Sequence, residues 1–237
     1  MKKTKIIVPA LGLLLLSTAA SVTGTVAWFA ANTTVTATGM SVTVKSDSTF
    51  LLIKAGEATL SEVRTGKKIS DTAVNQSAAL YPVAHESIAN IAAADEPSNW
   101  YYKTSDDPSL YGGANHESAA TALTSLDNYV LVNEFTLAIA EGGNNMSNIK
   151  VGACTITTAG DAAVNVLVAS ASASQEFTAS GDGSTVLQSS LTTTAVMSVK
   201  VYIYWNGADE DVTTNGIADL QTTSVELTFT GSVVAAA

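Results

Sequence analysis

The sequence predicts an all-β protein with the architecture of a sandwich or barrel. Its 237 residues are 46% hydrophobic but only 6% aromatic. The apolar share comes largely from Ala and Val, whereas Thr, Ser and Asn supply most of the polarity, a mixture that favours β-sheet. Segments of β-branched and alternating residues recur along the chain and are separated by turns rich in Gly, Asn and Asp. Seven such segments are typical of a two-sheet sandwich or a closed barrel.

Residues 1–27 have the organisation of a secretory signal. Three lysines lie among the first five residues, and the uncharged apolar run 6–16 follows them. Small residues permit cleavage after Ala27, which we prefer, or earlier after Ala19. Without cleavage, the uncharged stretch 6–31 is long enough to span a bilayer, although its single proline, its glycines and its hydroxyl residues weaken this alternative. We therefore expect a secreted protein that meets a membrane only during export.

The predicted strands follow in order along the mature chain. They cover residues 33–44, 50–54, 129–140, 148–157, 163–170, 195–205 and 223–234. Gly39 breaks the phase of the first strand, which indicates a bulge there. The strictest alternation lies in 195–205, which we predict to be a central strand. Its core-facing residues are expected to be Val199, Val201, Ile203 and Trp205, and Lys200, Tyr202 and Tyr204 should lie on the other face.

Residues 56–126 differ from the rest and are predicted to form a long inserted excursion with short helices at 87–94 and 118–125. Its aromatic residues could form a patch that binds a sugar or another ligand, or a plug that holds the excursion against the core. We favour the plug, because large aromatic side chains commonly anchor such loops. The residues in question are Trp100, Tyr101, Tyr102 and Tyr111.

The N-terminal region resembles that of the TasA and camelysin-like proteins of Gram-positive bacteria. The resemblance lies in residues 24–32 (GTVAWFAAN), in Val35, in Gly39-Met40 and in residues 41–44. The blocks 129–135 and 201–209 also look like segments of clostridial proteins with the same kind of signal. The resemblance implies processing by the signal peptidase SipW, with Trp28 as the first mature residue. It also implies a jelly-roll-like β-sandwich over 28–237 that polymerises into extracellular biofilm-matrix fibres, each subunit donating its N-terminal strand to the next.

The residues themselves also favour self-association. A mature N-terminus with two adjacent aromatic residues on a Thr/Val/Ala strand needs a buried site. Donation to another copy by β-strand addition would make a homopolymer, whereas folding back would complete the subunit's own sandwich. Both alternatives stay open at this point. The donor candidate is 28–44, and its predicted interface residues are Trp28, Phe29, Val35 and Ala37. The second functional hypothesis is a monomeric cell-surface adhesin or carbohydrate-binding module that uses the aromatic patch.

Composition argues against several other classes. With 11 basic and 21 acidic residues, and a net charge of −10, the chain is not expected to bind nucleic acid. No GxSxG, P-loop or GxGxxG motif occurs. Cys154 has the setting of a small buried hydrophobe, and His85 and His116 are interpreted as solvated loop residues. We therefore expect neither enzymatic activity nor a small-molecule substrate.

One acidic segment could hold a hard cation. Asn206, Asp209 and Asp211 place several oxygen ligands in a single predicted loop, as calcium requires. An acidic turn without a metal is the favoured interpretation. No other cofactor is expected.

Overall fold

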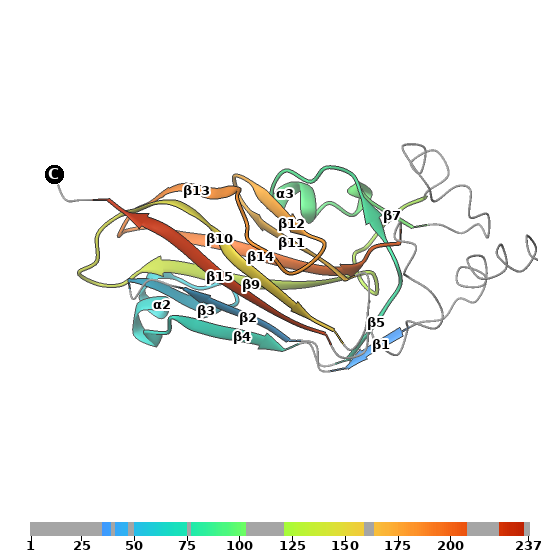
Figure 1. The fold of residues 1–237 in the computed structure, drawn as a ribbon, viewed down its shortest axis with the longest axis horizontal. Coiled ribbons are helices and arrows are strands. Elements are labelled where there is room, and N and C mark those ends of the chain that lie inside the picture. Colours follow the sequence, from blue (N-terminus) through green and yellow to red (C-terminus); the bar gives the residue numbers. More distant parts are fainter. Residues whose placement is uncertain are drawn as a thin grey trace, which may run out of the picture.

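The computed structural model describes residues 35–38, 41–46, 50–74, 77–102, 121–158, 164–207 and 223–234. Two five-stranded sheets pack face to face (Figure 1). The first sheet has the order β13-β10-β15-β2-β4, with the bounds Val186–Leu191, Met146–Thr157, Ser224–Val233, Ser41–Ser46 and Ser70–Val74. The second has the order β12-β11-β14-β9-β3, with the bounds Ser174–Phe177, Val164–Ser170, Val196–Trp205, Val130–Ile139 and Leu51–Ala55. The prediction of an all-β sandwich is confirmed.

The main core lies between these sheets and follows the predicted alternation. Val199, Val201, Ile203 and Trp205 of β14 are all fully buried in it. β14 is the middle strand of its sheet, paired with β11 on one side and β9 on the other, which confirms the prediction of a central strand. Within the two sheets every pairing is antiparallel except that of β15 with β2, which is parallel.

The outer face of the second sheet is covered at one end by a helix. α2 (Leu60–Gly66) buries Val63 against Leu52 and Ala138. The helix begins at a capping box in which the Thr59 hydroxyl accepts from the Glu62 N–H and the Glu62 carboxylate accepts from the Thr59 N–H at 2.8 Å. The T-x-x-E pattern at 59–62 is visible in the sequence and could have predicted this helix, which our sequence analysis missed.

The same face is covered at its other end by what we call the cover layer, residues 83–102 with 121–123. It contains a three-stranded sheet, β6-β7-β8, a short helix α3 and one 3-10 turn η1. Their bounds are Ala84–His85, Trp100–Tyr102, Thr121–Ala122, Ile91–Ala94 and Pro97–Asn99. The cover layer explains why Tyr202 and Tyr204 of β14, on the face opposite the main core, are buried as well.

A separate two-stranded ladder lies beyond one end of the sandwich. β1 (Val35–Thr38) pairs antiparallel with β5 (Ser77–Leu80) and belongs to neither large sheet. In Figure 1, β1 lies next to the start of β15, whereas the C-terminal end of the chain lies at the opposite end of the molecule. β2 follows β1 in the sequence and is built into the first sheet, where Val42 and Val44 are fully buried.

Two predictions about residues 56–126 are wrong. The helix expected over 118–125 is replaced, where the structure describes it, by β8, because Thr121 and Ala122 pair with β7. Nor is the whole segment an excursion, since β4 pairs with β2 as an edge strand of the first sheet. The helix expected over 87–94 is shorter and begins at Ile91, because the Asn90 side chain caps it by accepting from the Ala93 N–H at 3.0 Å.

Candidate functional site

Several apolar side chains are exposed at the end of the sandwich where β15 finishes. We call it the apolar end and define it by Phe50, Val196, Val233 and Val234, which are between 41% and 51% exposed. The adjoining turns are tied together: the Ala140 N–H donates to the Phe50 carbonyl at 2.7 Å, and the Val234 N–H donates to the Asn145 carbonyl at 2.8 Å. Exposed apolar side chains that lie at the same end of a fold can contribute to an interaction surface.

At the apolar end, one backbone edge of β15 has no ladder partner among the described residues. Its partner β2 stops at Ser46, opposite Phe229. The last residues of β15 continue to pair with β10, through Thr230 with Lys150 and Val233 with Met146. On the other side, no described residue forms a ladder with Thr230–Val233. Such an edge can accept a further strand through backbone hydrogen bonds.

The predicted donor segment is only partly within the described residues. Trp28 and Phe29 lie outside them. Val35 is paired with Leu80, and Ala37 with Ala78, in the same chain. The C-terminal part of the candidate segment 28–44 belongs to β2, which lies between β15 and β4 with its valines in the main core. Donation of the segment to another copy stays a prediction.

The predicted aromatic patch is mostly internal. Trp100 has no exposed surface, and its indole N–H donates to the Ala94 carbonyl at 2.8 Å. Its ring packs edge-on against Tyr204, with centroids 5.1 Å apart. Trp100 is therefore wrong as a ligand-binding residue and acts as the plug that joins the cover layer to the sheet. Tyr101 and Tyr102 are half-buried, and Tyr111 lies outside the described residues.

The structure places a polar cluster beside Trp100 that the sequence analysis did not find. His85 was expected to be solvated, but its side chain is only 8% exposed. The His85 Nε2 lies 2.8 Å from the Tyr204 hydroxyl and 3.6 Å from a Glu176 carboxylate oxygen. The Tyr204 hydroxyl donates to Glu176, and Asn165 donates to the same carboxylate at 2.9 Å. These groups come from four strands, so no local motif could have indicated the cluster.

The cluster shifts the titration of two of its members. The His85 imidazole makes the largest contribution to lowering the pKa of Glu176 to about 2, and hydrogen bonds from Tyr204 and Asn165 lower it further against the effect of burial. Burial, followed by the neighbouring Glu176 charge, raises the pKa of Tyr204 well above its ordinary value. Glu176 is therefore a carboxylate, and Tyr204 a neutral phenol, throughout the physiological range.

The lowered pKa of Glu176 predicts a loss of stability in acid. Because the folded-state pKa of about 2 is below the ordinary glutamate value of 4.5, the contribution of Glu176 to stability is fully present above pH 4.5 and declines as the pH falls through the folded value. We expect the urea midpoint of the wild type to fall more steeply than that of Glu176→Gln between pH 4.5 and pH 2. Glu57→Gln, at an exposed carboxylate, should behave as the wild type; equal slopes for all three proteins would contradict the prediction.

The predicted calcium loop receives no support from the described residues. Asp209 and Asp211 lie outside them. Asn206 forms a parallel β-bridge with Val83, and the Gly207 N–H donates to the Val83 carbonyl at 3.0 Å, so this backbone anchors the cover layer. Within the described part of the chain, no group of three or more His, Cys, Asp or Glu side chains could hold a metal ion. Calcium binding stays a prediction.

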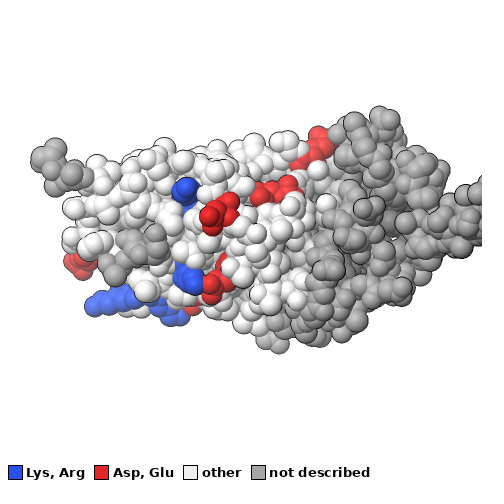
Figure 2. Space-filling model, viewed as in Figure 1, with Lys and Arg blue, Asp and Glu red and all other residues white. Residues whose placement is uncertain are grey.

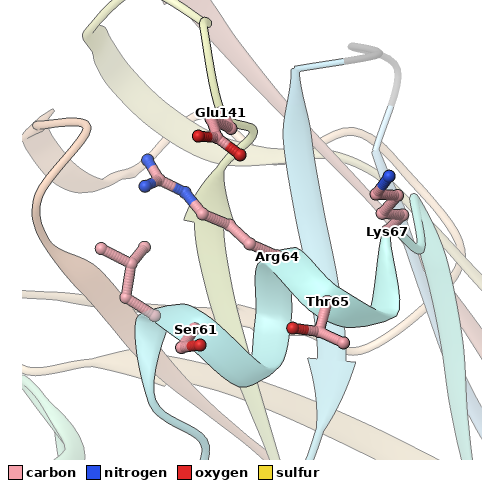
Figure 3. A pocket seen from close by; sticks show the side chains of 6 residues that line it. Ser61, Arg64, Thr65, Lys67 and Glu141 are labelled. Carbon is pink, nitrogen blue, oxygen red and sulfur yellow. The ribbon is translucent and has the colours of Figure 1, made fainter.

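A shallow hollow of about 600 Å³ lies beside α2 and is lined by Leu60, Ser61, Arg64, Thr65, Lys67 and Glu141. Figure 3 shows Arg64 leaving the helix toward the turn that carries Glu141. Its guanidinium donates to two backbone carbonyls, from Nε to Ile139 at 3.0 Å and from Nη2 to Thr193 at 2.6 Å. Arg64 thus fixes α2 to the turns at the apolar end.

Surface charge does not define a second site. On the face drawn in Figure 2, charged side chains are scattered singly or in small groups, and most of the described surface is neither acidic nor basic. Cys154, the only cysteine in the sequence, is buried as predicted. Burial raises its pKa to about 12, so the thiol is unreactive at neutral pH.

Known proteins give no further information about this site. No family model matches the chain, and neither a curated protein nor a solved structure is significantly similar to it. Within the residues that the structure describes, no helix has the length and apolar character needed to cross a membrane.

Proposed function

We propose that this is an exported structural protein that polymerises into extracellular surface or biofilm-matrix fibres. In this proposal the N-terminal segment of each mature subunit binds the apolar end of the next. The main support for this proposal is the position of the apolar end, which lies opposite the end of the molecule where β1 lies (Figure 1). A contact that joins opposite ends of identical subunits is heterologous and propagates as a filament.

The donated part is residues 28–34, with Trp28 and Phe29 as its anchors. β1 stays paired with β5 of its own chain and acts as the stem from which this segment extends. Val35 and Ala37 therefore remain within the subunit instead of forming the interface. The segment, WFAANTT, contains no charged residue. Since the mature chain would carry 8 basic and 21 acidic residues, an uncharged segment is well suited to approach another copy.

The accepting surface combines two features of the apolar end. The edge of Thr230–Val233 that no described residue pairs with offers backbone groups for β-strand addition, and Phe50, Val233 and Val234 offer apolar surface to the two aromatic anchors. Each backbone hydrogen bond adds about 0.5 to 1.5 kcal/mol net. Burying an aromatic side chain adds about 1.5 to 3 kcal/mol.

Chain length favours donation between molecules. Ser224, at the start of β15, lies beside Ser41, and Val233 is nine residues further along β15, about 30 Å away at 3.3 Å per residue. The seven residues 28–34 span at most about 25 Å when fully extended. While β1 remains on β5, Trp28 therefore falls short of the apolar end of its own subunit and reaches only that of a neighbour.

Disulfide cross-linking of mature protein tests this arrangement. Ala30→Cys combined with Val233→Cys should give a ladder of disulfide-linked oligomers after mild oxidation. Ala30→Cys combined with Val132→Cys is the matched control, because Val132 is also exposed but lies within β9, away from the apolar end. Cys154 does not interfere, since it is buried.

Each outcome of the cross-linking experiment is informative. A ladder from the first pair and not from the control supports docking at the apolar end. An intramolecular disulfide in a monomer would show that the N-terminal segment folds back on its own subunit. Equal ladders from both pairs, or monomers with free thiols from both, would contradict the proposed interface.

A further inference from the structure

The polar cluster under the cover layer has a hydrogen-bond arrangement that fixes the positions of its protons. The His85 Nδ1 faces the carbonyl oxygen of Glu86, which can only accept. The His85 Nε2 faces the Tyr204 hydroxyl oxygen at 2.8 Å. That hydroxyl has one proton, which it donates to the Glu176 carboxylate. Both ring nitrogens of His85 therefore face acceptors.

Only the imidazolium form of His85 keeps every contact of this arrangement at once, because it alone has two N–H donors. In the neutral tautomer protonated at Nδ1, the single Tyr204 proton must serve either Nε2 or Glu176, so one contact is lost. In the other tautomer, the lone pair of Nδ1 faces the Glu86 carbonyl. Asn165 cannot replace the missing donor at His85, since its amide already donates to Tyr204 at 3.2 Å and to Glu176 at 2.9 Å.

These contacts join the cover layer to the sandwich. His85 lies on β6 of the cover layer, whereas Asn165, Glu176 and Tyr204 lie on β11, β12 and β14. The His85 ring also packs edge-on against Trp100, with centroids 4.8 Å apart. Two further ionisable residues of the described chain lie beside it, Glu86 and Tyr101, and the Tyr101 hydroxyl donates to the Glu86 carboxylate at 3.2 Å. Loss of the His85 proton thus leaves the Glu176 carboxylate, whose side chain is 36% exposed, without the cation that faces it.

We propose that His85 is a pH-sensitive latch that holds the cover layer closed when it is protonated and releases it when it loses its proton. The layer has a second polar fastening that does not depend on histidine: Asp95 accepts from Lys200 Nζ at 2.7 Å and from the Tyr202 hydroxyl at 2.8 Å. Loss of the latch should therefore loosen the layer without detaching it. The inference is independent of the proposed fibre, because the cluster contains no residue of the apolar end or of the N-terminal segment.

Hydrogen exchange followed by mass spectrometry tests the latch, with rates corrected for the intrinsic effect of pH. In the wild type we expect peptides from residues 83–102 to exchange at least tenfold faster at pH 8 than at pH 5, a range in which histidine commonly changes charge. Peptides from β9 and β14 should keep their protection. His85→Gln should abolish the difference between the two pH values. His116→Gln, which changes the only other histidine of the chain, should retain it.

A second measurement uses only the wild type, so its result does not depend on whether the His85→Gln variant folds. Nitrogen-15 spectra at pH 5 should show protons on both ring nitrogens of His85, as the hydrogen-bond arrangement requires. A neutral His85 ring at pH 5 would overturn the proposal. Equal protection of residues 83–102 at both pH values, or an unchanged pH dependence in His85→Gln, would also overturn it.

Discussion

Mature protein that begins at Trp28 should assemble into filaments, and the double variant Trp28→Ala, Phe29→Ala should remain monomeric under the same conditions. Aromatic side chains commonly supply most of the binding energy of an interface, and here two of them stand in a segment of seven residues. We expect the pelletable fraction after ultracentrifugation to fall at least tenfold, and negative-stain electron microscopy should show no filaments.

Two controls separate loss of the anchors from other effects. Asn32→Ala lies in the same segment and removes no aromatic surface, so it should assemble normally. Wild-type protein with several extra residues before Trp28 should assemble poorly if a free N-terminus must enter the neighbouring subunit. Filaments of normal abundance from the double variant would refute the role of Trp28 and Phe29. Monomers from every form of the protein would refute polymerisation itself.

Replacement of Trp100 by alanine should cause the largest loss of stability among single changes in the cover layer. Trp100 is fully buried and is the largest side chain of the cluster that joins the layer to β11 and β14. Deletion of a buried aromatic side chain generally costs about 3 to 5 kcal/mol, from lost transfer energy and from the cavity left behind. The Ala94 carbonyl would also lose the indole N–H that donates to it.

Urea unfolding of Trp100→Ala and of Tyr101→Ala would measure this difference. Tyr101 is the next residue on β7 and is only half-buried, so its replacement should cost less than about 1.5 kcal/mol. Equal effects of the two substitutions would show that Trp100 is not the plug. Tight binding of a sugar by the wild type, lost in Trp100→Ala while the stability is unchanged, would restore the ligand-binding interpretation.

Local pattern predicted the long strands well. All seven predicted strand segments contain a strand of the structure, and the core face of β14 follows the alternation of residues 199–205. Pattern did not predict the short strands β4, β12 and β13. β4, with the sequence SDTAV, has little apolar alternation, and it is a strand because β2 offers it a backbone ladder. Such strands depend on a partner more than on their own residues.

Some of the candidate site residues could likewise be predicted from local pattern, and others could not. The aromatic N-terminal segment and the buried Cys154 could be recognised from neighbouring residues alone. The apolar end could not, because Phe50, Val196 and Val233 are far apart in the sequence and ordinary members of strand-like segments. Nor could the burial of Tyr202 and Tyr204, which requires the cover layer.

The all-β class, the long strands and the face of β14 that enters the main core could all be recognised from the residues alone. These properties follow from alternation, which relates residues two positions apart. The burial of His85 against Glu176, 91 positions later in the chain, could not be recognised in this way, nor could the pairing of β1 with β5 while β2 enters the first sheet. Burial and hydrogen bonding depend on distances in space, and these distances are set by sheet pairing and not by local composition.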